Sequence, residues 1–274
     1  MSRARRLTGP GVGRIIRTHM TYSVLVLGGG QLARMMLPAA SRLDIDLTVL
    51  DPSPRCPACS GANRAIAGDF ADYDAVVAAA AATEPDAVTI EIEHVSTRAM
   101  AEVARRGVPV HPGAETLEAV NDKLRQRQRL RDAGLPMPRF FEVPGSAPPK
   151  AGSGRAGAKP EAAAAHSPAA GERSRDKEIP ALLHELGLPA VQKLRFGGYD
   201  GRGVAMVRED ASPLPLPGPS MLEARVDIAR EVAVLVARSA SGETAVYEPV
   251  EMEMDPELHL VRSVFYPATL DPEL

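Results

Sequence analysis

Residues 24–35, VLVLGGGQLARM, decide the fold of the first part of the chain. An apolar run ends in three glycines, and Gly28, Gly30 and Ala33 match the G-x-G-x-x-G/A spacing of a strand that turns tightly into a helix. The start of such a helix suits an anion, because free backbone N–H groups and the helix dipole both favour negative charge there. The stretch therefore predicts an anion-binding turn at the start of an α/β domain.

Strand and helix patterns alternate from Tyr22 to Gly134. Apolar runs typical of buried strands occupy 23–28, 46–51, 87–93 and 108–112, and helical patterns occupy 31–43, 72–84, 96–107 and 113–134. Strands that alternate with helices indicate a parallel sheet covered on both faces. We therefore predict a Rossmann-like domain over 21–122.

The pattern changes after this domain. Residues 144–177 are dominated by Ala, Pro, Gly, Ser and charged residues, a composition that predicts a disordered insertion. Closely spaced strands with short turns then follow a short helix, which is typical of an α+β domain, so 123–274 is predicted to be a second domain. The Arg-rich segment 1–20 precedes the first strand pattern and is interpreted as a disordered extension or a mis-assigned start.

Composition excludes several classes of function. The formal net charge is -3, with 24% charged residues, so nothing favours nucleic acid as a partner. The longest apolar runs are too short for a membrane span, and a cytoplasmic location is expected. Cys56 and Cys59 form a C-x-x-C pair, but no second pair completes a zinc site, so they are predicted to be ordinary reduced thiols in a Pro-rich loop.

The most specific motif is VQKLRFGGYDGRGV, residues 191–204. Its four glycines between two strand patterns predict a hairpin whose backbone N–H groups can close over phosphates. Lys193, on the entering strand, offers a point charge to a nucleotide, and Arg202 offers a planar fork to an oxyanion. This combination predicts a nucleotide-binding loop.

A second polar motif, IEIEH, covers residues 90–94 at the end of a predicted parallel strand. Alternation along the strand would place Glu91 and Glu93 on one face, at the sheet edge where ligands of doubly wound domains bind. We therefore expect a polar substrate site there. Glu223 and Glu231, taken alone, have the pattern of solvated charges beside strands.

Taken together, these motifs resemble those of the N5-carboxyaminoimidazole ribonucleotide synthetase family of ATP-grasp ligases in purine biosynthesis. The resemblance rests on LGGGQLARM, GDFADYDAV, VTIEIEHV, NDKLRQRQRLRDAGLPMPRF, GGYDGRGV and REVAVLVARSASGE, and it covers Tyr22 to about Ala268. It implies a pre-ATP-grasp domain followed by an ATP-grasp domain.

The resemblance also implies roles for individual residues. The implied ATP contacts are Lys123, Lys193, Gly198, Tyr199, Asp200, Gly201, Arg202, Gly203, Val204, Glu223, Ala224, Arg225, Val226 and Glu231. The implied substrate contacts are Gln31, Glu91, Glu93 and His94, and the implied catalytic residues are Tyr199, Asp200 and Arg202.

The implied activity is that of an ATP-dependent carbon–nitrogen ligase that carboxylates the amine of 5-aminoimidazole ribonucleotide with bicarbonate, through carboxyphosphate. The implied ligands are ATP and Mg²⁺, and a homodimer is expected for the intact family protein. The family continues beyond the point where this sequence stops, and the Mg²⁺ ligands are expected in that further part, so the ATP-grasp domain is expected to be incomplete and this chain alone to be inactive.

Three alternatives stay open. An NAD-dependent oxidoreductase is suggested by Asp51, which follows the glycines at the spacing of a ribose-binding acid. A formate-using glycinamide ribonucleotide transformylase shares the EIEH motif. A non-catalytic remnant would bind nucleotide without turnover.

Overall fold

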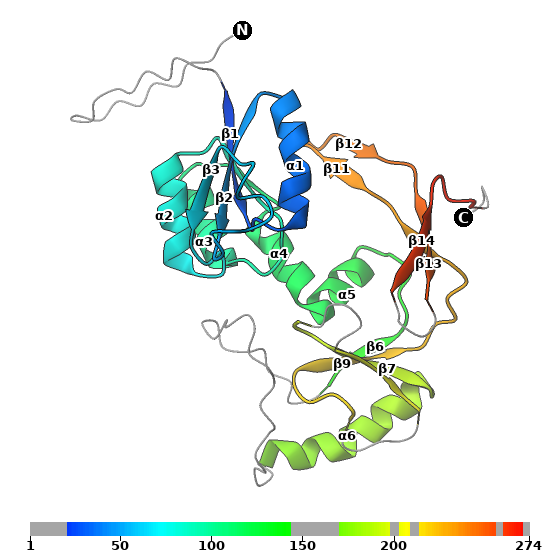
Figure 1. Ribbon diagram of the computed structural model, residues 1–274. Coiled ribbons are helices and arrows are strands. Elements are labelled where there is room, and N and C mark those ends of the chain that lie inside the picture. Colours follow the sequence, from blue (N-terminus) through cyan, green and yellow to red (C-terminus); the bar gives the residue numbers. More distant parts are fainter. Residues whose placement is uncertain (1–20, 144–169, 198–202, 209–213, 256–259, 271–274) are drawn as a thin grey trace. The chain divides into compact units, whose positions relative to one another are not determined.

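The computed structural model describes residues 21–143, 170–197, 203–208, 214–255 and 260–270 and, for 170–177, the backbone alone (Figure 1). The chain forms two compact units, which meet in the sequence between Leu117 and Glu118. The predicted extension 1–20 and residues 144–169 of the predicted insertion lie outside the described ranges. Across those ranges, no helix combines the length and the apolar character needed to span a membrane.

The first unit is a five-stranded parallel sheet with helices on both faces (Figure 1). Its elements are β1 (Tyr22–Leu27), α1 (Gln31–Arg42), β2 (Ile45–Asp51), β3 (Arg64–Ala67), α2 (Tyr73–Thr83), β4 (Ala87–Ile90), α3 (Thr97–Arg105) and β5 (Val110–His111), and α4 (Ala114–Asn121) follows across the division. The strand order is β3-β2-β1-β4-β5, and every neighbouring pair is parallel. The predicted Rossmann-like parallel sheet is confirmed.

The strand order decides where a ligand can bind. Strands β2 and β3 lie in turn on one side of β1, and the chain then crosses over so that β4 pairs with the other side of β1. The carboxyl ends of β1 and β4 therefore form the switch point of the sheet, the usual ligand position in open α/β folds. Two of the predicted motifs, the glycines after β1 and IEIEH at the end of β4, meet there.

Alternation along β1 divides the core of this unit into two layers. Leu25 and Leu27 pack with residues of α2 and α3, whereas Val26 packs in a separate cluster with α1. All three side chains are completely buried. A strand buried on both faces reads as a continuous apolar run, which is why VLVL lacks the alternation of a half-exposed strand.

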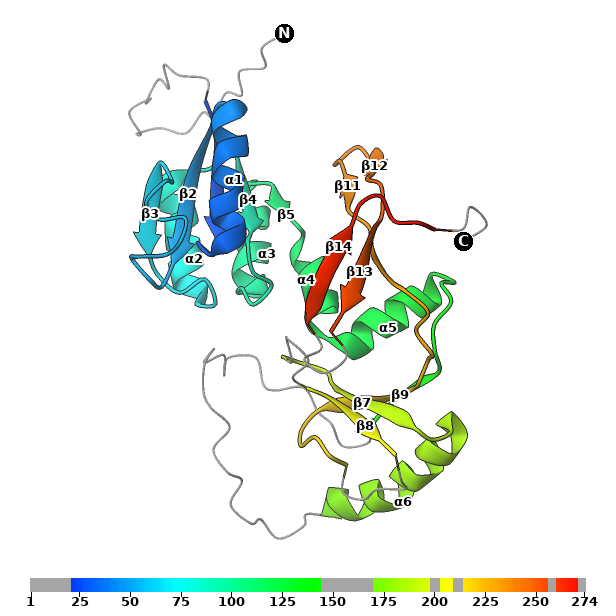
Figure 2. The same ribbon diagram turned by 45° about the vertical axis from the view of Figure 1, so that its right-hand side comes forward.

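The second unit is α+β, as predicted (Figure 2). Its elements are α5 (Lys123–Asp132), β6 (Phe140–Glu142), α6 (Ala170–Leu186), β7 (Ala190–Leu194), β8 (Val204–Val207), β9 (Ser220–Ala224), β10 (Glu231–Ala233), β11 (Val236–Arg238), β12 (Thr244–Val246), β13 (Val250–Met254) and β14 (Val261–Phe265). An antiparallel sheet has the order β6-β9-β7-β8, and Ile179 and Leu183 of α6 pack on it. The remaining strands form the sheet β10-β13-β14 and the hairpin β11-β12.

Two sequence predictions about element boundaries are wrong. The helix predicted over 113–134 is two helices, because the Asp122 carboxylate accepts hydrogen bonds from the N–H groups of Leu124 and Arg125 and so starts a new helix. The strand predicted over 87–93 ends at Ile90. Helix α6 begins at Ala170, within the segment 144–177 that the sequence predicted to be a disordered insertion, and the disorder of that insertion stays a prediction.

Candidate functional site

The conformation of the glycine turn, residues 28–30, depends on its own backbone angles and on the nearby Glu91 side chain. Gly28 has φ +98°, a backbone conformation that residues other than glycine adopt only at an energetic cost. A Cβ on Gly30 would lie 2.5 Å from Oε1 of Glu91, so a larger residue would displace that carboxylate from its present position. The turn needs its glycines for its conformation and for the close approach of Glu91.

The Glu91 carboxylate takes the position at the start of α1 that the sequence predicted for an anion. The N-cap residue, Gly30, has no side chain to cap the helix, and the N–H of Leu32 donates to Oε1 of Glu91 at 3.3 Å. A carboxylate here satisfies a free N–H group and is favoured by the helix dipole. The anion at this turn is therefore a side chain of the same unit.

Asp51, the residue that suggested a dinucleotide, is also committed to the turn. Its carboxylate accepts hydrogen bonds from the N–H of Gly29 at 2.9 Å and from the N–H of Ser53 at 2.8 Å. These contacts fix the glycine turn to the end of β2. The spacing of Asp51 from the glycines is therefore explained by its hydrogen bonds to the turn, without a bound ribose.

The other predicted substrate residues lie near the same switch point. Because β4 ends at Ile90, Glu91 and Glu93 do not share a strand face, which corrects the prediction from alternation. Glu93 Oε1 lies 3.5 Å from His94 Nε2, and both side chains are about half exposed. Gln31 is exposed at the first position of α1. The structure thus leaves these three side chains accessible.

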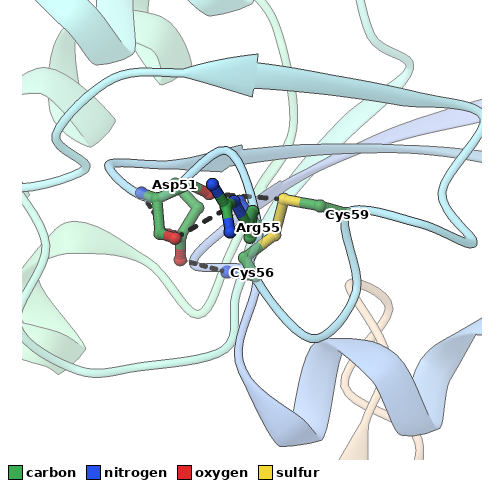
Figure 3. Close-up of a disulfide and its surroundings, with 6 residues drawn as sticks. Asp51, Arg55, Cys56 and Cys59 are labelled. Atoms are coloured by element: carbon green, nitrogen blue, oxygen red, sulfur yellow. Dashed lines mark hydrogen bonds between the residues drawn. A yellow bond between two sulfur atoms is a disulfide. The ribbon is translucent and has the colours of Figure 1, made fainter.

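The two cysteines form a disulfide in the loop that follows β2 (Figure 3). A tight turn, in which the N–H of Cys59 donates to the carbonyl of Cys56 at 3.0 Å, brings their Cα atoms to 5.0 Å. The prediction of reduced thiols is therefore wrong. The buried Cys56 packs on Gly29, and the N–H of Ala58 donates to the Gly29 carbonyl at 2.9 Å. The loop that holds the disulfide therefore packs against the glycine turn and hydrogen-bonds to it.

In the second unit, the two predicted nucleotide lysines lie at one end of β7. The N–H of Lys123 donates to the carbonyl of Arg195 at 3.0 Å, and its Nζ donates to the carbonyl of Gly197 at 2.7 Å. Lys193 is on β7 itself and pairs in register with Val204 of β8. Both lysines therefore adjoin the two ends of the predicted phosphate loop.

Glu223 is a buried carboxylate that contacts two cations of this region. Its Oε1 lies 2.8 Å from Nζ of Lys193, and its Oε2 lies 2.7 Å from Nε of Arg127. Burial raises its pKa, but the hydrogen bonds from Arg127 and Lys193 lower it more, so the pKa lies below the usual value. We call Lys123, Arg127, Lys193 and Glu223 the basic cluster.

A second buried ion pair supports the basic cluster. The guanidinium of Arg195 donates to both carboxylate oxygens of Asp122, at 2.6 and 3.0 Å, and to Glu142 at 2.5 Å. The pKa of Arg195 is raised, first by the hydrogen bonds to Asp122. Since Asp122 also begins α5, this pair fixes the start of the helix that carries Lys123 to the end of β7.

The remaining predicted nucleotide contacts are spread over the unit. Gly203 precedes β8, where Val204 is the first residue, and Ala224 ends β9. Arg225 pairs with Asp227 at 2.8 Å, and Val226 is exposed. Glu231 lines an open cavity of about 530 Å³ on the sheet β10-β13-β14. The contacts predicted for Gly198, Tyr199, Asp200, Gly201 and Arg202 lie outside the described residues.

Sequence reasoning missed Arg127, Arg195, Asp122 and Glu142. Arg127 follows Lys123 by four residues, the spacing of neighbours on one helix face, which was a usable signal. Asp122 has the residue type and the position of an N-cap. The pairing of Arg195 with Asp122, however, joins residues 73 positions apart and has no local signal.

Comparisons with known proteins agree with this architecture. Residues 21–121 match the ribonucleotide synthetase preATP-grasp domain, and residues 164–271 match the ATP-grasp domain. The N5-carboxyaminoimidazole ribonucleotide synthase of Synechococcus elongatus is 34% identical over 231 residues, which are 82% of this chain and 50% of the relative. The chain thus spans about half the length of the curated relatives it matches.

Two solved structures have the same fold over most of the chain. One is the N5-carboxyaminoimidazole ribonucleotide synthetase from Thermotoga maritima, with a TM-score of 0.71 and 28% identity, covering 92% of this chain and 57% of that one. The other is the N5-carboxyaminoimidazole synthase from Aspergillus clavatus in complex with ADP and 5-aminoimidazole ribonucleotide, with a TM-score of 0.71 and 27% identity, covering 92% and 59%. With its two matched domains, this chain belongs to the N5-carboxyaminoimidazole ribonucleotide synthetase family of ATP-grasp proteins.

Proposed function

We propose that the chain takes part in the ATP-dependent carboxylation of the amine of 5-aminoimidazole ribonucleotide. The observation that carries the proposal is the basic cluster, in which Arg127 and Lys193 pair with the buried Glu223 carboxylate while Lys123 hydrogen-bonds the Gly197 carbonyl at the start of the glycine-rich loop. Such an excess of positive charge suits the phosphates of a nucleotide. Relatives solved with ADP and with the aminoimidazole ribonucleotide support the choice of ligands.

In the proposed reaction, an oxygen of bicarbonate attacks the γ-phosphorus of ATP, the bond to ADP breaks, and carboxyphosphate forms. The carboxyl carbon then passes to the exocyclic amine, which loses a proton as phosphate leaves. Lys123 and Lys193 would neutralise the phosphate charge of ATP. Glu91, Glu93, His94 and Gln31 would contact the aminoimidazole ribonucleotide, and Tyr199, Asp200 and Arg202 are the proposed catalytic residues.

Mg²⁺ would supply further charge stabilisation to the phosphates. Among the residues that the structure describes, no group of His, Cys, Asp and Glu side chains could hold a metal ion. We therefore assign no step of the reaction to the metal. The binding and activity measurements are made both with and without Mg²⁺. The homodimer and the cytoplasmic location stay predictions.

Ligand-dependent thermal shifts test the class of ligand. We expect ADP with Mg²⁺ to raise the melting temperature of the chain and NADH to leave it unchanged. Stabilisation by NADH alone would contradict the proposal and favour the oxidoreductase.

Release of ADP from ATP tests the reaction. Release that requires both bicarbonate and aminoimidazole ribonucleotide supports the proposed activity, whereas release with formate and glycinamide ribonucleotide supports a transformylase. Binding of ADP without release under either condition identifies a nucleotide-binding protein without turnover.

A further inference from the structure

Glu223 is shared between two cations that come from different elements. Its two carboxylate oxygens each take one partner: Oε1 takes Lys193 from the neighbouring strand β7, and Oε2 takes Arg127 from α5. The Glu223 side chain is 5% exposed, and those of Lys193 and Arg127 are 21% and 23% exposed. The carboxylate is thus buried, while both cations still reach the surface.

The charge count of this group depends on Arg127. With Arg127 present, one negative charge faces two positive ones, so the group keeps a net positive charge. Without Arg127, Glu223 and Lys193 would form a neutral pair, and a phosphate would have to compete with the carboxylate for the ammonium. An arginine suits this position, because its guanidinium stays charged at all physiological pH values.

Register and helix geometry explain why these side chains meet. Lys193 pairs with Met221 of β9, and Glu223 lies two residues further along β9, so the two side chains are diagonal neighbours on one face of the sheet. Lys123 and Arg127 are one helical turn apart on α5 and so share a helix face. The face of α5 that carries a predicted nucleotide contact therefore also carries the second partner of Glu223.

We propose that Arg127 is a positioning residue that keeps Lys193 available to a nucleotide phosphate by sharing the Glu223 carboxylate. This inference rests on the proposed nucleotide binding and adds to it a residue that the sequence motifs did not mark. Arg127 acts through Glu223 and need not touch the nucleotide.

The test is the dissociation constant of ADP, measured by isothermal titration calorimetry on the full chain and on four variants. We expect Arg127→Gln to raise the dissociation constant about tenfold, the effect of losing one charge-assisted contact. Arg127→Lys keeps the charge and should stay within about threefold of the wild type. Arg125→Gln is the matched control, because Arg125 is on the same helix in an exposed pair with Glu118 and should leave ADP binding unchanged.

The decisive variant is the double substitution Arg127→Gln with Glu223→Gln. If Arg127 acts by sharing the Glu223 carboxylate, then replacing that carboxylate removes the anion that competes with the nucleotide for Lys193. The ADP affinity should therefore return to within about threefold of the wild type. A purely structural role predicts no such rescue, since the double variant would lose both contacts. Amide hydrogen exchange of α5 and β9 shows whether each variant keeps its local fold.

The results separate the two proposals. A wild-type chain that does not bind ADP overturns the proposed function and this inference with it. A wild-type chain that binds ADP, together with an Arg127→Gln variant that binds equally well or is not rescued by Glu223→Gln, overturns the inference alone.

Discussion

Replacing Arg195 by methionine should be among the most destabilising single changes in the second unit. The Arg195 side chain is 9% exposed and its partner Asp122 is 4% exposed, and their bidentate contact is removed completely by the substitution. Methionine keeps an apolar chain of similar length but leaves the Asp122 carboxylate buried without its cation. Removing one partner of a buried ion pair typically costs about 3–5 kcal/mol.

The structure favours the lower end of this range. In the variant, Asp122 would still accept hydrogen bonds from the N–H groups of Leu124 and Arg125, and the start of α5 would still favour its charge. We therefore expect a loss of about 3 kcal/mol in the free energy of opening of this region. Asp122→Asn keeps a capping oxygen and leaves Arg195 its contact with Glu142, so it should cost less, about 2 kcal/mol.

Hydrogen exchange measured by mass spectrometry is the appropriate assay. The chain contains no tryptophan, and its two units need not unfold in one transition, so a single optical melting curve would not isolate the effect. A loss of 3 kcal/mol corresponds to exchange that is roughly 150-fold faster in α5 and β7, with little change in the first unit. Arg125→Met removes an exposed pair from the same helix and serves as the control, with an expected cost below about 1 kcal/mol.

Two results would refute this reasoning. Exchange in Arg195→Met that matches the Arg125→Met control would show that the buried pair contributes no net stability. Additive effects in the double variant Arg195→Met with Asp122→Asn would show that the two side chains are not coupled, because contacting partners should give a smaller combined loss than the sum.

Three further predictions concern other parts of the molecule. Gly30→Ala should destabilise the first unit and lower its melting temperature, because the new Cβ would lie 2.5 Å from the Glu91 carboxylate; the double variant with Glu91→Ala should recover part of the loss in differential scanning calorimetry. The lowered pKa of Glu223 means that its charge stabilises the fold above its unfolded pKa, about 4.3, and that this contribution is lost as the pH falls through the folded value. Urea unfolding below pH 4.5 should therefore depend less on pH in Glu223→Gln, and equal slopes would contradict this. Reduction of the Cys56–Cys59 disulfide by dithiothreitol should cost about 2 kcal/mol, as expected for a very short closed loop, and Cys59→Ser should remove the effect of the reductant on the melting temperature.

Local sequence patterns predicted the elements but not always their limits. The continuous apolar run VLVL predicted a strand buried on both faces, and Leu25, Val26 and Leu27 are indeed completely buried. The helix over 113–134 was predicted too long because the helical periodicity continues through Asn121 and Asp122. That periodicity does not show the hydrogen bond by which the Asp122 carboxylate starts a new helix. Strand β4 was predicted too long because alternation alone does not show where its pairing ends.

The sequence by itself determined the order of elements, the parallel sheet of the first domain, the α+β character of the second and the motifs that identify the family. These features depend on local periodicity and on residues close together in the chain. Only the tertiary structure decided which charges meet: Glu91 at the start of α1, Arg127 with Glu223, and Arg195 with Asp122. Each of these contacts joins residues at least 59 positions apart, so strand register and helix placement create them, and no local pattern records them.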